Sequence, residues 1–294
     1  MNYSEEPVAP LRIVLADIRK RLTPKYGEGE AREMGRIIFE NLKGWNPVEL
    51  ALRQNELISE YIVAKIDNII NRLLDDEPIQ QIFGQADFYG MKLKVSRDTL
   101  IPRQETAELV DIIVKENHAK DLRVLDAGTG SGCIAIALSR NLLFPEVTAI
   151  DISEKALEIA RENAKTLHAR VSFINADITR LCECFRNEQF DIIVSNPPYI
   201  AEKEKATMER NVLEYEPSTA LFVPDSKPLI FYIAILKAAQ ENLLVPGGKV
   251  YFEINPLFAN ELQTEAILLG FINISQIRDT YGKIRFLSAE KENN

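Results

Sequence analysis

Apolar residues recur at helical spacing through the first 76 residues. Because positions three and four apart share one face of a helix, we predict a domain over residues 1–76 built of four or five short helices. The apolar groups are Leu11, Val14, Leu15 and Ile18, then Met34, Ile37, Ile38 and Leu42, then Ile58, Ile62, Ile66 and Ile70. The breakers between them are Pro24, Gly27, Gly44 and Pro47.

The pattern changes after Pro78, where apolar and polar residues begin to alternate. Alternation through Phe88–Gly90 and Leu93–Val95 is typical of strands, because successive side chains of a strand point to opposite faces. We therefore predict a β-hairpin linker over residues 77–102.

From Leu122 onward, strand patterns and helix patterns alternate. Short apolar runs indicate strands at 123–126, 146–151, 171–175, 191–195, 249–254, 272–278 and 283–289. Amphipathic runs indicate helices at 104–117, 133–141, 153–167, 228–244 and 259–269. Such alternation predicts an α/β domain over residues 103–294, with a doubly wound, mostly parallel seven-stranded sheet. The closing hairpin predicts an antiparallel edge.

Composition narrows the function classes. The chain has 294 residues and a formal net charge of −9. So acidic a chain is a poor general binder of nucleic acid, because phosphate contacts need clustered Lys and Arg, although a local basic patch stays possible. We therefore expect no direct nucleic-acid partner.

Three cysteines (Cys133, Cys182 and Cys184) are too few and too irregular for a disulfide framework, which favours a reducing, cytoplasmic location. No metal-ligand spacing is apparent, so no metal is expected. The acidic start, Met1–Glu6, favours neither a signal peptide nor a transit peptide, and no apolar run approaches a membrane span.

A stiff polar elbow follows the buried strand pattern Phe190–Ser195. It consists of Asn196, Pro197, Pro198 and Tyr199. Prolines lack an N–H, so turn carbonyls are left free to accept hydrogen bonds from a ligand, as is the Asn196 side-chain oxygen. With the flat face of Tyr199 beside them, these acceptors suit a planar group that bears an NH₂.

A glycine-rich loop, Asp126–Gly132, lies between the first strand and the first helix of the alternating region. Its Gly-x-Gly-x-Gly spacing differs from the dinucleotide fingerprint, and no Gly-Lys-Ser/Thr is present for a P-loop. The loop resembles that of class I S-adenosylmethionine-dependent methyltransferases. The resemblance implies S-adenosyl-L-methionine as cofactor, with Asp126 near its amino-acid end.

Two further strand ends support this ligand. Asp151, about 20 residues past the loop, can accept both hydroxyls of a ribose, whereas Ser153 suits the alternative role of helix cap better. The resemblance places Asp177 and Ile178 near the adenine. The cofactor-binding residues that we expect are Gly128, Thr129, Gly130, Ser131, Gly132, Asp151, Asp177, Ile178 and Asn196.

Asn-Pro-Pro-Tyr is shared by enzymes that methylate planar nitrogen groups: adenine N6 in DNA, guanine N2 in RNA and the glutamine side-chain amide. Accepting both N–H hydrogens at the Asn196 oxygen and the Pro197 carbonyl would direct the nitrogen lone pair toward the methyl group. We therefore expect Asn196 and Pro197 to be catalytic, and residues 196–199 to bind the substrate. No base is evident from a motif.

Other motifs resemble the peptide-chain release factor glutamine N5-methyltransferase family over nearly the whole chain. They are Glu77–Gly84, Phe88–Gly90, Leu100–Arg103, Tyr215–Pro217 with Ala220–Leu221, Phe252–Ile254 and Asp279–Gly282. The resemblance implies methylation of the glutamine in a Gly-Gly-Gln loop, and docking of the release factor by the helical domain. Nothing in the sequence demands a dimer, so a monomer is expected.

The chain departs from the family pattern after Arg103, where it has Gln104–Glu108, and at Asn255, where glycine is common. Two alternatives stay open: an N-methyltransferase for DNA adenine or RNA guanine, and a binding module without turnover. Arg103 suits a structural role or a substrate contact equally. Cys133 is expected in the core, and Trp45 in packing or docking.

Overall fold

The computed structural model describes residues 6–293. It divides into two compact units, Met1–Phe83 and Gly84–Asn294, each described here by itself. Residues 1–5, on which the expectation of no signal peptide partly rests, lie outside the described part of the chain. Within residues 6–293, no helix is both long enough and apolar enough to cross a membrane.

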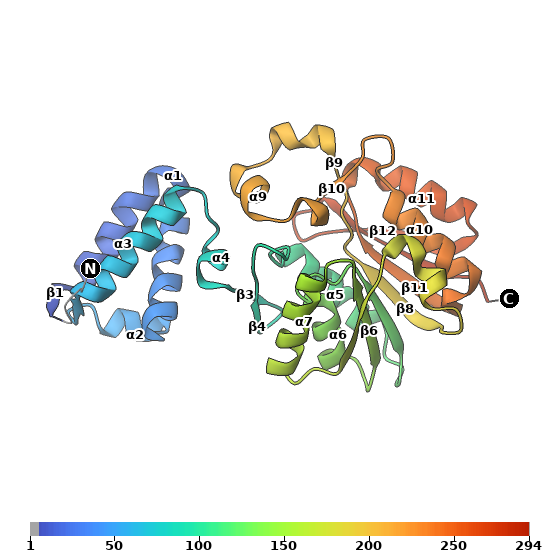
Figure 1. The fold of residues 1–294 in the computed structure, drawn as a ribbon, viewed down its shortest axis with the longest axis horizontal. Coiled ribbons are helices and arrows are strands. Elements are labelled where there is room, and N and C mark those ends of the chain that lie inside the picture. The colour runs from blue at the N-terminus through green and yellow to red at the C-terminus, as the bar shows by residue number, and fades with distance from the viewer. Residues whose placement is uncertain (1–5, 294) are drawn as a thin grey trace. The chain divides into compact units, whose positions relative to one another are not determined.

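The first unit is the predicted helical bundle (Figure 1). Its elements are β1 (Pro7–Pro10), α1 (Leu11–Lys43), α2 (Pro47–Leu52), β2 (Leu57–Ser59), α3 (Glu60–Leu74) and α4 (Ile79–Phe83). α1 is broken at Gly27, as the sequence predicted, whereas the short β1–β2 pair was not foreseen. Trp45 stacks on Phe39 in the buried core, with ring centroids 5.9 Å apart, which supports its packing role.

The hairpin is shorter than predicted. It consists of β3 (Gln85–Phe88) and β4 (Met91–Lys94), while residues 79–83 form a helical turn, because the amide of Ile82 donates to the Pro78 carbonyl. The hairpin belongs to the second unit, where the backbone of Lys94 exchanges hydrogen bonds of 2.7 and 3.0 Å with the side chain of Asn163. The three-part domain division stays a prediction.

The second unit holds the predicted strand and helix alternation. Its main elements are α5 (Gln104–Glu116), β5 (Arg123–Ala127), α6 (Cys133–Asn141), β6 (Glu146–Asp151), α7 (Glu154–Thr166), β7 (Val171–Asn175), α8 (Leu181–Cys184), β8 (Phe190–Ser195), α10 (Ile230–Ala238), β11 (Leu244–Glu253), α11 (Ala259–Leu268), β12 (Phe271–Arg278) and β13 (Ile284–Lys291). Between β8 and α10 lie β9 (Ile200–Ala201), α9 (Arg210–Tyr215) and β10 (Phe222–Val223).

Seven strands form one sheet in the order β12-β13-β11-β8-β5-β6-β7. β11, β8, β5, β6 and β7 are parallel neighbours, as predicted. The closing hairpin does lie at one edge. As predicted, this edge is antiparallel: β13 lies between β11 and β12 and pairs antiparallel with both.

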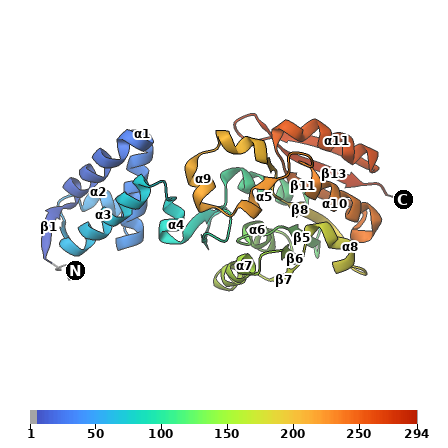
Figure 2. The ribbon, with the colours of Figure 1, turned by 45° about the horizontal axis from the view of Figure 1, so that its top comes forward.

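Helices cover both faces of the sheet because its strands are apolar on both sides. Along β5, Leu125 and Ala127 belong to the core cluster that includes α10 and α11, whereas Val124 belongs to the cluster with α5 and α6. Successive residues of a strand point to opposite faces, so one short strand contributes side chains to the core on each face of the sheet. Figure 2 shows the two helical layers on either side of the strands.

Candidate active site

The site lies where the strand order reverses. β5 pairs with β6 on one side and β8 on the other, and the chain fills the sheet outward from this point. The glycine loop follows β5 and the elbow follows β8, so the topology brings them to neighbouring strand ends. In open α/β sheets, ligands bind at this position.

The loop glycines adopt backbone angles that other residues avoid. Gly128 has a φ of 82°, and a Cβ there would lie 3.2 Å from the Ile178 side chain. Gly132 has a φ of 83°, and its Cβ would lie 3.1 Å from the side chains of both Ala160 and Ile136. The loop therefore packs closely on α7 and on the segment after β7.

Asp126 lies fully buried beneath the loop. Its Oδ2 accepts hydrogen bonds from the Thr129 hydroxyl at 2.6 Å and the Ala135 amide at 3.1 Å. Burial raises the pKa of Asp126 to about 7. Its Oδ1 has no hydrogen-bond partner among the described residues, which fits a cationic ligand group.

Asp151 orders the loop directly. Its Oδ2 accepts from the Gly130 amide at 2.8 Å, and its Oδ1 from the Ser153 amide at 2.9 Å. Ser153, as expected, caps α7 by accepting from the Ala156 amide. Each Asp151 oxygen keeps a second lone pair, so both can still accept a ligand hydroxyl. Burial raises the pKa of Asp151.

The glycine loop and Asp151 border one cavity of about 440 Å³, whereas Asp126, which was expected near the cofactor, is buried beneath the loop and does not line the cavity. Its lining contains most of the predicted site residues: Gly128, Thr129, Gly130, Ser131, Asp151, Asp177, Ile178, Asn196 and Pro198. Among the residues that the structure describes, Gly132, Pro197 and Tyr199 were predicted for the site but do not line the cavity. Gly132 caps α6.

The elbow is tied to a buried carboxylate. Asn196 donates from Nδ2 to the Thr106 hydroxyl at 3.2 Å, and Thr106 donates to Oε2 of Glu253 at 2.7 Å. The Tyr199 hydroxyl donates to Oε1 of Glu253 at 3.0 Å, and its side chain packs against the core. Burial raises the pKa of both Glu253 and Tyr199.

Asn255, the second departure from the family pattern, supports the elbow from outside. Its Nδ2 donates to the Tyr199 carbonyl at 3.2 Å and to Glu204 at 3.1 Å. Its oxygen accepts from the Leu257 amide. A glycine at this position would lack all three interactions.

Arg103 has a structural partner. Its guanidinium pairs with the Glu216 carboxylate, which is only 6% exposed and also accepts from the Ile101 amide at 3.2 Å. The pair joins two parts of the cavity lining, residues 98–102 and residues 217–222. Of the two roles left open for Arg103, the structural one accounts for these contacts.

Comparisons with known proteins agree with this geometry. A protein-family profile described as "PrmC N-terminal domain" matches residues 14–84, and one described as "Methyltransferase domain" matches residues 118–247. A release factor glutamine methyltransferase of Bacteroides thetaiotaomicron is 44% identical over 95% of this chain and 99% of its own length. The chain belongs to the release factor glutamine methyltransferase family. A second relative of that name, from Flavobacterium psychrophilum, is 40% identical over 89% of this chain and 92% of its own length.

Among solved structures, a methyltransferase from Pyrococcus furiosus superposes with a TM-score of 0.51 at 22% identity. The match covers 77% of this chain and 99% of that one, and it shows the shared class I methyltransferase fold. The family member described here is thus a methyltransferase whose cofactor is S-adenosylmethionine. The unpartnered Asp126 oxygen, the two acceptors of Asp151 and the cavity volume fit that cofactor.

Several lining residues were missed by sequence reasoning. Thr106 and Phe222 were not singled out. Glu253, which does not line the cavity but accepts a hydrogen bond from Thr106, was noted only as part of a family motif. The available signal was a carboxylate at the end of the apolar run Val250–Ile254, since a buried charge needs partners. Its partners could not be foreseen, because Thr106 lies 147 residues away in sequence.

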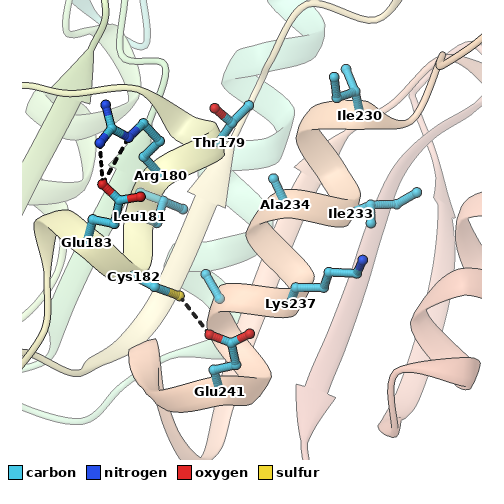
Figure 3. A pocket seen from close by; sticks show the side chains of 11 residues that line it. Thr179, Arg180, Leu181, Cys182, Glu183, Ile230, Ile233, Ala234, Lys237 and Glu241 are labelled. Carbon is cyan, nitrogen blue, oxygen red and sulfur yellow. Dashed lines mark hydrogen bonds and ion pairs between the residues drawn. The ribbon is translucent and has the colours of Figure 1, made fainter.

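A second hollow, of about 450 Å³, lies beside α8 and α10 (Figure 3). Two pairs of its side chains interact: Arg180 pairs with Glu183, and the Cys182 thiol donates to Glu241. In the described part of the chain, none of the predicted site residues lines it, and no cluster of three or more His, Cys, Asp or Glu side chains is arranged to hold a metal.

Proposed function

We propose that this protein transfers the methyl group of S-adenosylmethionine to the side-chain amide nitrogen (N5) of the glutamine in the Gly-Gly-Gln loop of peptide-chain release factors. The supporting observation is that Asn196 of the Asn-Pro-Pro-Tyr elbow lines the same cavity as the glycine loop. Relatives that span almost the whole chain are named for glutamine methylation, which favours this substrate over the nucleic-acid alternative.

The elbow holds the amide that reacts. The Asn196 Oδ1 and the Pro197 carbonyl accept the two N–H hydrogens of the substrate, which directs the nitrogen lone pair away from them. Pro198 and Tyr199 stiffen this turn. The bound cofactor supplies an electrophilic methyl group on its sulfonium sulfur. As the new N–C bond forms, the methyl–sulfur bond breaks and its electron pair stays on sulfur. The nitrogen becomes acidic in this step, so its proton passes to solvent without a strong base.

The loop residues Gly128, Thr129, Gly130 and Ser131 hold the amino-acid end of the cofactor together with Asn196. Asp151 accepts the ribose hydroxyls, and Asp177 with Ile178 contacts the adenine. Gly132 supports the loop by its packing on α7. This assignment agrees with the positions of Asp151, Asp177 and Ile178 in the cavity lining.

The helical unit docks the body of the release factor, and the protein acts as a monomer without direct nucleic-acid contact. The net charge of −9 supports the latter point. A cytoplasmic location is supported by three free cysteines, two of them exposed.

The test is mass spectrometry of purified release factor after incubation with this protein and S-adenosylmethionine. We expect the Gly-Gly-Gln peptide to gain one methyl group, and Asn196→Ala to lower the rate about 10²- to 10³-fold. Transfer to DNA or RNA, with none to the factor, would overturn the assignment.

A further inference from the structure

Thr106 joins Asn196 of the elbow to the carboxylate of Glu253. Thr106 and Glu253 are each 2% exposed, so bulk water does not compete for their hydrogen bonds. Glu253 receives two hydroxyl hydrogens, one from Thr106 and one from Tyr199. Its backbone carbonyl is held as well, by the Tyr232 hydroxyl at 2.9 Å.

The hydroxyls of Thr106 and Tyr199 favour the ionised form of Glu253, and in that form the hydrogen count fixes the direction of this chain of hydrogen bonds. A threonine hydroxyl has one hydrogen, and an ionised carboxylate can only accept. Once Thr106 donates to Glu253, its oxygen offers only lone pairs to Asn196. The amide of Asn196 can then face Thr106 with its NH₂ group but not with its oxygen, because two acceptors repel.

We propose that Thr106 is a positioning residue, which with Glu253 fixes the Asn196 amide so that Oδ1 faces the substrate. The inference rests on the proposed function of Asn196 as an acceptor for the glutamine amide. In the opposite orientation, Asn196 would present donors to the substrate NH₂, and the elbow would repel the group that it has to bind.

The first test compares Thr106→Val with Thr106→Ser, using a release factor as substrate. Val keeps the shape but removes the hydroxyl, and we expect a kcat about tenfold lower, whereas Ser restores it. The matched control is Thr148→Val. Thr148 is a half-buried residue of β6 that does not line the cavity, so this variant should keep wild-type kcat. A Val variant with normal kcat, or a Ser variant as slow as Val, would overturn the proposal.

Calorimetry with S-adenosylmethionine separates this role from cofactor binding, because Thr106 also lines the cavity. We expect Thr106→Val to bind the cofactor within about twofold of wild type. A loss of cofactor affinity as large as the loss of kcat would show that Thr106 acts through cofactor binding, directly or through Asn196, and would overturn the proposal.

A double-mutant cycle tests whether Thr106 acts through Asn196. In an Asn196→Ala background, adding Thr106→Val should cost little further activity, since the amide that Thr106 orients is gone. If the two losses multiply, Thr106 has an independent role and the proposal fails.

The orientation can also be read without activity, by NMR of the wild-type protein. The Asn196 NH₂ signals, identified by their loss in Asn196→Ala, should show contacts to the Thr106 side chain. Their absence would overturn the inference for any substrate. An active enzyme is not needed, so the result is independent of whether the release factor is methylated.

Discussion

At the residue scale, the site depends on two carboxylates that accept hydrogen bonds from the protein before any ligand binds. Asp126 holds the glycine loop through the Thr129 hydroxyl and also accepts from the Ala135 amide of α6. Asp151 holds the loop through the Gly130 amide and also accepts from the Ser153 amide. Both oxygens of Asp151 accept a backbone hydrogen bond, which explains why an acid rather than a neutral side chain stands at this position. A neutral amide cannot accept at both of its terminal atoms.

Because both Asp151 oxygens accept a backbone hydrogen bond, we expect Asp151→Asn to disrupt the loop. One end of the new side chain would be an NH₂ group facing the Gly130 or the Ser153 amide, so two donors would meet. We expect the dissociation constant for S-adenosylmethionine to rise about 10- to 100-fold, as for the loss of one or two charge-assisted hydrogen bonds. Isothermal titration calorimetry measures it. Unchanged affinity would remove Asp151 from the cofactor site.

At the element scale, the packing of α6 on α7 sets how close the loop can come. Gly132 begins α6 with a φ of 83°, and a Cβ there would press on Ala160. Gly282 has a similar φ of 81° in the turn before β13, but a Cβ there would meet open space. A side chain would strain the backbone at both positions, but it would be crowded by neighbouring atoms only at Gly132.

We therefore predict different costs for alanine at these two glycines. Gly282→Ala should lower the free energy of unfolding by about 1 kcal/mol, from backbone strain alone. Gly132→Ala should lower it by about 2–4 kcal/mol, since overpacking adds to the strain. Chemical denaturation of both variants gives the comparison. Equal losses would show that α7 yields to the added methyl group.

The sequence predicted the ends of some helices and strands correctly, where the signal for each end is local. The predicted ranges 133–141, 146–151 and 171–175 coincide with α6, β6 and β7, because strong periodicity and local caps set their ends. The position of β13 between β11 and β12 was missed, since a hairpin reads the same in either order. Likewise, the glycine loop and Asn196 could be named in advance, whereas Thr106 and Glu253 needed the folded contact between distant segments.

At the scale of the whole molecule, buried acids make stability depend on pH. Burial raises the pKa of Asp126 to about 7 in the folded protein, against about 4 for an exposed aspartate. Between these values the folded state binds more protons than the unfolded one. The free energy of unfolding contributed by Asp126 therefore falls as pH rises from about 4 to about 7, and is level above that.

Asp126→Asn should remove this contribution. Its oxygen can still accept from Thr129 and Ala135, while its NH₂ group takes the place of the unpartnered Oδ1. We expect the stability of wild type relative to this variant, without cofactor, to decline between about pH 4 and pH 7. Urea denaturation across that range tests it. A constant difference between the two proteins would contradict the raised pKa.

The two compact units also predict a division of labour. A fragment of residues 84–294 contains the whole seven-stranded sheet and the cavity lining, so it should bind S-adenosylmethionine like the full chain. If the helical unit docks the release factor, the fragment should show a KM for the factor at least about tenfold higher, with a smaller change in kcat. Equal KM values would assign docking to the catalytic unit.

The insertion of β13 between β11 and β12 also bears on how the chain reaches its fold during synthesis. The strands that carry the site, β5 and β8, can pair as soon as β8 has emerged. By contrast, β12 is made before β13, the strand that joins it to the sheet. Until Ile284–Lys291 arrives, β11 presents an open edge and β12 has no place in the sheet, and open edges invite pairing with other chains. The nascent protein thus holds a nearly complete catalytic centre while its sheet is still exposed to aggregation.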